Sequence, residues 1–320
     1  MHIRIRSLRS RAGFTLSELM IVVTLLGIIG TALTSLLMKQ QRFHAAVATM
    51  TDARARMRDI ATILPTDLRS ISSAGQDILT YDLTSMQFRA FIGTSVLCKY
   101  ATTTIIDLPP QNLVSKNVLT SWINPPVAND VAFVYDEGTE AGNADDSWTP
   151  YTISAVTSAA DATWCPSTTV PQYATAADDG ATRYRLTLAS APNQTQEPIG
   201  MPIRLTREVK YSVYQGADNQ WYVGYQTCTP NATFGLAGTC GTREVLAGPV
   251  LPATTDASTS GLYFLYYDQA GNALTAAADR NKIARIDVGV RTTSGSLRGA
   301  GTAAIAGDSL KFTIGIRNRI

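Results

Sequence analysis

Histidine is almost absent from this 320-residue chain: only His2 and His44 occur, and both lie near the N-terminus. A Ser-His-Asp triad, a Cys-His pair or a His-built zinc centre each needs at least one imidazole. None of these sites can therefore be assembled from residues 45–320 alone. The composition excludes the commonest hydrolase chemistries there, and we predict a protein that is not an enzyme and uses no cofactor.

Charged residues are also few, at 16% of the chain, and the net charge is only +2. Arg4, Arg6, Arg9 and Arg11 all precede Phe14, with no acidic residue among them. Of the 27 basic residues, all but these four, that is 23, lie after this leader and face 25 acidic ones. A nearly neutral body offers no bulk attraction to a polyanion, so we do not expect nucleic acid as a partner.

Residues 19–38 contain no charged side chain and are mostly apolar. Twenty helical residues extend about 30 Å, which is enough to cross the hydrocarbon core of a bilayer. The arginine-rich leader should stay in the cytoplasm. We therefore predict a transmembrane segment at about 16–38 and delivery of the following chain across the inner membrane.

Two ordinary interpretations leave part of this N-terminus unexplained. A cleaved secretory signal has an apolar core of about 7–15 residues before a small-residue cleavage site, whereas this run is longer and Ala32-Leu-Thr-Ser35 is only a fair match to such a site. A plain membrane anchor explains the length but not Glu18, because a charge at the centre of a membrane helix costs about 2.5–3.5 kcal/mol. Glu18 should therefore have a partner.

The segment Gly13-Phe-Thr-Leu-Ser-Glu-Leu19 resembles the prepilin motif of type IV pilins and type II secretion pseudopilins. The resemblance implies that a prepilin peptidase cleaves between Gly13 and Phe14, and that the new amine of Phe14 is methylated. Glu18 then becomes the fifth residue of the mature chain, and its implied partner is the α-amino group of Phe14 on a neighbouring subunit. Pairing the two charges in a dry helical bundle offsets the cost of burying each of them.

The helical pattern continues beyond the membrane segment, since apolar residues recur at three- and four-residue steps from Phe43 to Leu64. Pro65 is a natural stop for a helix. The first half of this helix is apolar all round, and the second half carries one apolar stripe that suits docking on a sheet. The predicted division is a leader at 1–13, a helix at 14–64, and a periplasmic or extracellular β-rich domain at 65–320.

From Asp77 onward the apolar period changes to two, which indicates strands. Two alternating stretches, 209–213 and 221–225, flank the turn residues Gly216-Ala-Asp-Asn219 and predict a hairpin. Further strands are expected at 130–135, 151–157, 183–189, 262–268, 283–291 and 310–316. The predicted fold class is α+β and pilin-like: a long N-terminal α-helix, transmembrane in its first half, packed on a large antiparallel β-rich globular domain. Residues 90–200 are expected to be a loop-heavy elaboration of the sheet.

All four cysteines follow the apolar segment, and none forms a C-x-x-C pair. An even number in an exported domain predicts two disulfides, with reduced buried thiols as the alternative. Cys228 and Cys240 flank a short loop containing Pro230, so we favour a bond between them, and Cys98–Cys165 then follows by elimination. Four cysteines allow three pairings.

One dense acidic run occurs, at residues 136–146. Asp136, Glu140 and Asp145 form a weak candidate for a Ca²⁺ site, but their spacing fails the EF-hand pattern. A solvated loop is the preferred interpretation. A second charged group, formed by the basic residues Lys311, Arg317 and Arg319, is expected to keep an edge strand soluble rather than to bind DNA or lipid headgroups.

Two further segments narrow the resemblance. Leu64-Pro-Thr-Asp-Leu-Arg-Ser-Ile-Ser-Ser-Ala-Gly75 and the Tyr-Tyr-Asp pattern ending at Asp268 resemble PilW-like minor pilins and J-type pseudopilins. The resemblance implies a minor pilin that helps to initiate a type IV pilus and is incorporated in or near its tip. Its implied partners are other minor pilins, the major pilin, prepilin peptidase and the inner-membrane assembly platform. The alternatives are a J-type pseudopilin of type II secretion and an adhesive or DNA-capturing tip module.

Overall fold

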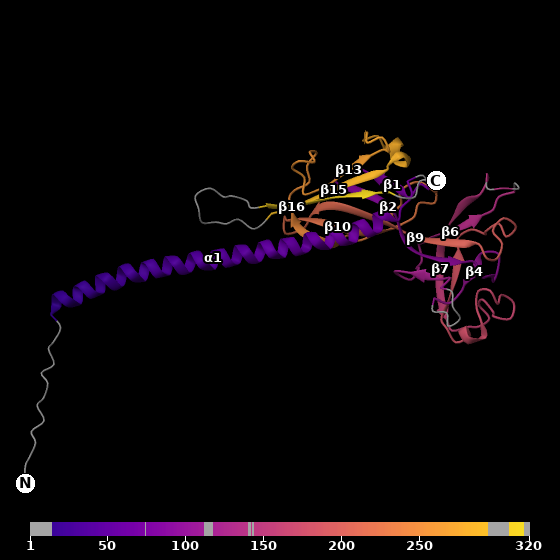
Figure 1. Ribbon diagram of the computed structural model, residues 1–320, viewed down its shortest axis with the longest axis horizontal. Helices are drawn as coiled ribbons and strands as arrows, with labels where there is room; N and C mark the ends of the chain where they lie inside the picture. The colour runs from indigo at the N-terminus through magenta and orange to yellow at the C-terminus, as the bar shows by residue number, and fades with distance from the viewer. Residues whose placement is uncertain are drawn as a thin grey trace, which may run out of the picture. The chain divides into compact units, whose positions relative to one another are not determined.

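The computed structural model describes residues 15–73, 75–111, 118–139, 142, 144–293 and 307–316 (Figure 1). The chain divides into two compact units, one comprising residues 1–52 with 294–306 and the other residues 53–293 with 307–320. One α-helix, α1 (Leu16–Arg69), begins in the first unit and ends in the second. The strands among the described residues all lie in the second unit. They are β1 (Ile78–Tyr81), β2 (Ser85–Val96), β3 (Lys99–Tyr100), β4 (Ile105–Leu108), β5 (Ser121–Trp122), β6 (Val131–Asp136), β7 (Ser147–Ala159), β8 (Arg183–Leu188), β9 (Pro202–Gln215), β10 (Trp221–Thr229), β11 (Thr239–Cys240), β12 (Glu244–Val250), β13 (Leu262–Tyr267), β14 (Ala273–Leu274), β15 (Arg285–Thr293) and β16 (Gly307–Gly315).

The second half of α1 packs on the sheet through the apolar stripe that the sequence predicts. Met57, Ile60, Leu64 and Leu68 recur at three- and four-residue steps, and each is at most 4% exposed. They belong to one core cluster with residues of β1, β2, β9, β10, β12, β13, β15 and β16. The α+β fold class is therefore confirmed: one long N-terminal helix is combined with a large antiparallel β domain.

The predicted end of the helix at Leu64 is wrong, because α1 continues through Pro65 to Arg69. A proline inside a helix removes one backbone hydrogen bond and crowds the preceding turn, at a cost of about 3 kcal/mol. Continuing the helix places Leu68 in the core, where it is fully buried. Burying a leucine side chain contributes about 1.5–3 kcal/mol, so tertiary packing offsets the local penalty.

The connection after α1 is held by a buried carboxylate, Asp77. Its Oδ2 accepts hydrogen bonds from the backbone N–H of Ser72 at 2.7 Å and from Nη2 of Arg204 at 2.6 Å. The same guanidinium donates to the carbonyl of Ser70 at 3.3 Å. Strand β9 therefore fixes the turn that leads from the helix into β1.

All strand pairs are antiparallel, and the main order is β14-β13-β15-β12-β10-β9-β6-β7-β8-β4-β3. Strands β2 and β9 are paired along almost their full length, from Ser85↔Ser212 to Val96↔Pro202. Strands β2 and β16 are not part of this main order. Strand β2 pairs with β9, and β16 pairs with β15. The predicted hairpin at 209–213 and 221–225 is confirmed, because Val213 pairs with Val223 between β9 and β10.

The long strands β2 and β9 contribute to two separate cores. Phe88 and Val209 belong to the core beneath α1, whereas Ile92 and Leu205 belong to a second core formed with β4, β6, β7 and β8. The register shifts between these regions at Phe91/Gly93. A side chain at Gly93 would meet the β5 backbone and Trp122 Cβ at 2.5 Å, so the close approach of β5 requires glycine.

Residues 90–200 elaborate the sheet and are rich in loops, as expected, but their strands also form a core that was not expected. This region contains β3 to β8 and most of β2, and these strands share a core with twelve buried hydrophobic residues. The pairing partners are far apart in sequence, as in Ile105↔Thr187. Alternation predicted β6, β7 and β8 but could not show which distant strands they pack with, so the second core was missed.

Candidate functional site

The candidate assembly segment is the first part of α1, residues 15–38. Thr15 and Glu18 form a reciprocal cap at its start: the backbone N–H of Thr15 donates to Glu18 Oε2 at 3.0 Å, and the N–H of Glu18 donates to Thr15 Oγ1 at 3.3 Å. This is the capping-box arrangement, which satisfies two of the four amides left unpaired at a helix N-terminus. The predicted cleavage and methylation residues, Gly13 and Phe14, lie outside the described residues.

Glu18 is fully exposed, and none of the salt bridges between described residues involves it. The hydrogen bonds that its carboxylate accepts from Thr15 both use Oε2. The second carboxylate oxygen, Oε1, makes no hydrogen bond to a described residue. Glu18 can therefore keep its capping role and accept a further donor from another chain.

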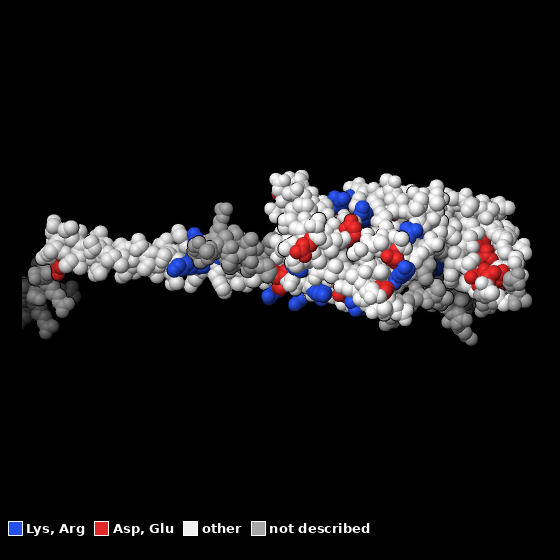
Figure 2. All heavy atoms as spheres, turned by 90° about the horizontal axis from the view of Figure 1, so that it is seen from above, with Lys and Arg blue, Asp and Glu red and all other residues white. Residues whose placement is uncertain are grey.

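The helix surface that follows Glu18 is apolar and exposed. Leu19, Ile21, Leu26 and Ile28 are 59–66% exposed, and the segment has a mean hydropathy of 2.3, long and apolar enough to cross a membrane. Figure 2 shows it as an uncharged stretch of surface between an acidic residue and a group of basic residues. In lipid, such a surface needs no protein partner, whereas in water it would.

The hydroxyl groups within this apolar run are satisfied by the helix itself. Thr24, Thr31, Thr34 and Ser35 each donate to a backbone carbonyl three or four residues earlier, at 2.7–3.1 Å. Unpaired polar groups cost several kcal/mol in hydrocarbon. The internal bonds therefore make all four residues compatible with a bilayer or with a dry bundle of helices.

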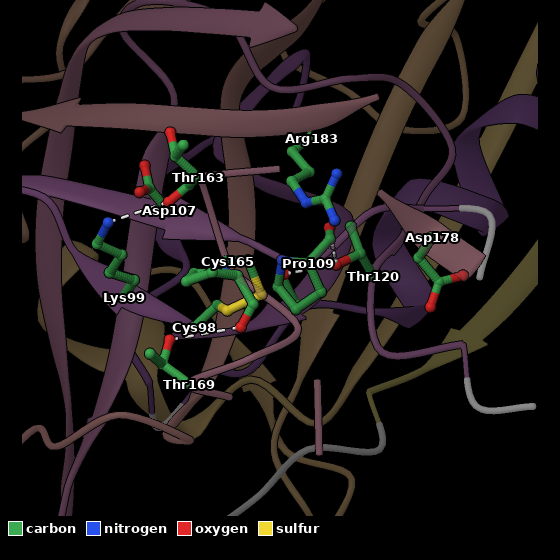
Figure 3. Close-up of a disulfide and its surroundings, with 12 residues drawn as sticks. Cys98, Lys99, Asp107, Pro109, Thr120, Thr163, Cys165, Thr169, Asp178 and Arg183 are labelled. Carbon is green, nitrogen blue, oxygen red and sulfur yellow. Dashed lines mark hydrogen bonds between the residues drawn. A yellow bond between two sulfur atoms is a disulfide. The ribbon is translucent and has the colours of Figure 1, made fainter. Parts of the chain in front are cut away.

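The structure pairs the cysteines as the sequence favours. Cys98 bonds to Cys165, and Cys228 bonds to Cys240. Figure 3 shows the first bond between the end of β2 and the loop after β7, where Lys99 Nζ donates to the carbonyl of Thr163 at 3.0 Å. This disulfide therefore ties the long loop at residues 160–182 to the segment that joins β2 to β3, and both cysteines belong to a third, small buried cluster with Val170 and Ala174.

The second disulfide closes residues 229–239, which we call the disulfide loop. The loop covers charged residues of β2 and β9 that sequence reasoning missed. Glu208, fully buried, accepts a hydrogen bond from Gln87 Nε2 at 2.6 Å and from the N–H of Gly238 at 2.7 Å. Arg89 is 2% exposed and stacks on Phe234 of the loop, 4.3 Å from the ring centre.

The acidic loop shows no convergence on a metal ion among its described members. Asp136 Oδ1 accepts from the N–H of Gly138 at 2.8 Å, and Asp145 Oδ2 accepts from the N–H of Thr139. Glu140 lies outside the described residues. In the described part of the chain, no group of three His, Cys, Asp or Glu residues could hold a metal ion.

The expected basic edge is described only at Lys311. Its Nζ lies 3.7 Å from Asp287 Oδ2, and β16, which carries it, pairs with β15. Arg317 and Arg319 lie outside the described residues. Lys311 of β16 is therefore one member of a mixed-charge pair with Asp287 of β15.

Comparison with known protein families gives a match near the N-terminus. Residues 8–34 match the family described as the prokaryotic N-terminal methylation motif. Neither the curated proteins nor the solved structures give a match to this chain. The motif supports a pilin- or pseudopilin-type protein, for which processing by prepilin peptidase and pilin-type partners are implied in general, and the apolar N-terminal helix fits a single-pass membrane anchor.

Proposed function

We propose that this chain is a minor pilin of the PilW-like kind, which takes part in initiating assembly of a type IV pilus and is incorporated in or near the pilus tip. The observation that carries the proposal is the match of residues 8–34 to the methylation motif. The matched segment includes the start of an exposed apolar helix with Glu18 in its first turn. An anchor alone needs the apolar surface but not the carboxylate.

In the proposed mechanism, prepilin peptidase cleaves between Gly13 and Phe14 and methylates the new amine of Phe14. The helix then remains in the inner membrane, with the β domain in the periplasm, until the assembly platform moves the subunit into the filament. There, Glu18 accepts the amine of Phe14 from a neighbouring subunit. Because Thr15 occupies only Oε2, the cap does not have to break before that contact forms.

The β domain supplies the surfaces that select neighbours in this proposal. Hydrophobic cores and two disulfides stabilise this domain. The sequence after His44 lacks the imidazole that the commonest hydrolase sites require. The proposed neighbours are other minor pilins and the major pilin. In this proposal the β domain determines which subunits bind, and the helix forms the assembly contact that all subunits share.

Deletion of the gene tests the proposal against its alternatives in one strain. We expect loss of surface pili and of twitching motility, restored by the wild-type copy, with exoprotein secretion unchanged. Loss of secretion with normal pili would instead identify a J-type pseudopilin. A tip module that binds a surface or DNA predicts ligand binding by the full-length protein that Glu18→Ala leaves unchanged, together with normal numbers of pili after deletion.

A further inference from the structure

A cavity of about 240 Å³ lies between the last turns of α1 and the sheet formed by β2, β9, β10 and β12. Its lining includes Ile63 and Asp67 of α1, Ile123 after β5, Tyr225 of β10 and Leu246 of β12. Ile63 is 40% and Ile123 is 68% exposed. The cavity is therefore open to solvent, and two aliphatic side chains stand at its rim.

The polar groups of the cavity are gathered around Asp67. Asp67 Oδ2 accepts the hydroxyl proton of Tyr211 at 2.6 Å, while its Oδ1 makes no hydrogen bond to a described residue. The hydroxyl of Tyr225 likewise has no hydrogen-bond partner in the described part of the chain. A carboxylate oxygen and a hydroxyl are thus both available to a ligand in a largely apolar cavity that is open to solvent.

The electrostatic balance of this site is negative. Burial raises the pKa of Tyr225, and so do the negative charges of Asp67, Asp130 and Glu244. The guanidinium of Arg207 acts in the opposite direction. Arg207 is already neutralised by Asp130, with Nε–Oδ1 at 2.7 Å and Nη2–Oδ2 at 2.8 Å. Burial raises the pKa of Asp67, and no basic residue lowers it. Arg207, the cation in the cavity lining, is thus already paired with Asp130, and none of the salt bridges between described residues involves Asp67.

The size of the cavity limits what can fill it. Small-molecule sites usually enclose about 300–1,000 Å³, so this one is better matched to a single long side chain. Lysine and arginine carry an apolar stem and a charged head. Their stems suit the walls formed by Ile63, Ile123 and Leu246, and their heads suit Asp67 and the hydroxyl and ring of Tyr225.

We propose that this cavity is a docking site for a lysine or arginine side chain of a neighbouring protein chain. The stem lies between Ile63 and Ile123, and the cationic head bonds to Asp67 Oδ1 and the Tyr225 hydroxyl. Occupation supplies the partly buried Asp67 carboxylate with an opposite charge. The proposal does not depend on the kind of filament that the chain joins, because it concerns binding that can be measured without assembly.

The test uses full-length protein in detergent and two matched probes, N-acetyl-lysine amide and N-acetyl-norleucine amide. The second keeps most of the stem and removes the amine. Saturation-transfer NMR should show saturable binding of the lysine probe, at least ten-fold tighter than that of the norleucine probe. Equal binding of the two probes, or none by the lysine probe, would overturn the proposal.

Variants identify the site. Asp67→Asn removes the charge but keeps an oxygen acceptor for Tyr211, and it should weaken binding of the lysine probe at least ten-fold. Asp59→Asn, an exposed acid two turns earlier on the same helix, should leave binding unchanged. Should Asp67→Asn fail to fold, Ile123→Arg at the exposed rim, which supplies a cation within the chain, should lower binding at least ten-fold. Unchanged binding in a folded Asp67→Asn or Ile123→Arg protein, or an equal loss in Asp59→Asn, contradicts the site.

Discussion

Tyr211 of β9 donates its hydroxyl proton to Asp67 Oδ2 of α1 across 2.6 Å. Tyr211 is fully buried, and burial, reinforced by the Asp67 charge, raises its pKa. The bond joins the final turns of the helix to a strand 144 residues later. The bond lies beyond Pro65, in the last turn of α1, which the burial of Leu68 in the core stabilises.

Asp67 should make stability depend on pH. Burial raises the native pKa of Asp67 above its unfolded value, so the folded state binds the proton more readily. This contribution is complete below the unfolded pKa and is lost as pH rises through the native pKa. We expect the melting temperature of the wild type, relative to Asp67→Asn, to increase as pH falls through that window. Thermal melts of the full-length protein in detergent would show this, and a difference constant with pH would contradict it.

Glu208 should hold the disulfide loop closed. Glu208→Ala removes the bonds to Gln87 and Gly238, each worth about 1.5–3 kcal/mol because the acceptor is charged. We expect a marked loss of unfolding free energy and faster proteolysis within residues 229–239. Glu208→Gln, which keeps an oxygen acceptor, is the matched control and should retain most of the protection. If both variants are cleaved at the same rate, these bonds do not restrain the loop.

Leu68 tests the extension of the helix. Because Leu68 is fully buried, Leu68→Ala should lower the free energy of unfolding by about 2–5 kcal/mol. Ile63→Ala, at a position that is 40% exposed, should cost clearly less. Chemical denaturation of the two variants gives the comparison. Equal costs would mean that residues beyond Pro65 do not enter the core as described.

The two disulfides should differ in their contribution to stability. The cysteines are 67 residues apart in Cys98–Cys165 and 12 in Cys228–Cys240. In the chain-entropy account the longer loop contributes more, by about 1.5 kcal/mol at 25 °C. Serine replacement of each pair, followed by denaturant unfolding, measures the two costs. A larger cost for the shorter loop would show that contacts of the disulfide loop, not chain entropy, dominate.

Gly13 should determine processing. Gly13→Leu places a bulky side chain at the proposed cleavage site, and we expect a precursor that retains its leader, carries no methylated Phe14 and does not assemble. Intact-mass measurement of membrane fractions distinguishes the two forms. Gly30→Ala is a suitable control, because nothing lies within 4 Å of the added Cβ and the site lies within the helix. Mature protein of normal mass from the Gly13 variant would disprove the cleavage assignment.

Local patterns were sufficient wherever a segment satisfies its own backbone or pairs with its neighbour in sequence. The uncharged run at 19–38 predicts a helix that can span a membrane, because about 20 apolar helical residues are long enough to cross the hydrocarbon core. The β9–β10 hairpin was predictable because its turn fixes the register. The cysteine pairing was favoured by the short spacing of Cys228 and Cys240, with Cys98 and Cys165 left over.

Tertiary structure decided the rest. Pro65 is a local stop, and only the burial of Leu68 beneath the sheet carries the helix past it. Alternation predicts that Glu208 and Val209 lie on opposite faces of the sheet. It cannot predict that a loop 30 residues later covers Glu208. The second core depends on strands such as β4 and β8, which lie far apart in the chain. The sequence by itself thus determined the anchor and the motif at its head, whereas the domain surfaces, including the cavity at Asp67, arise from contacts between distant segments.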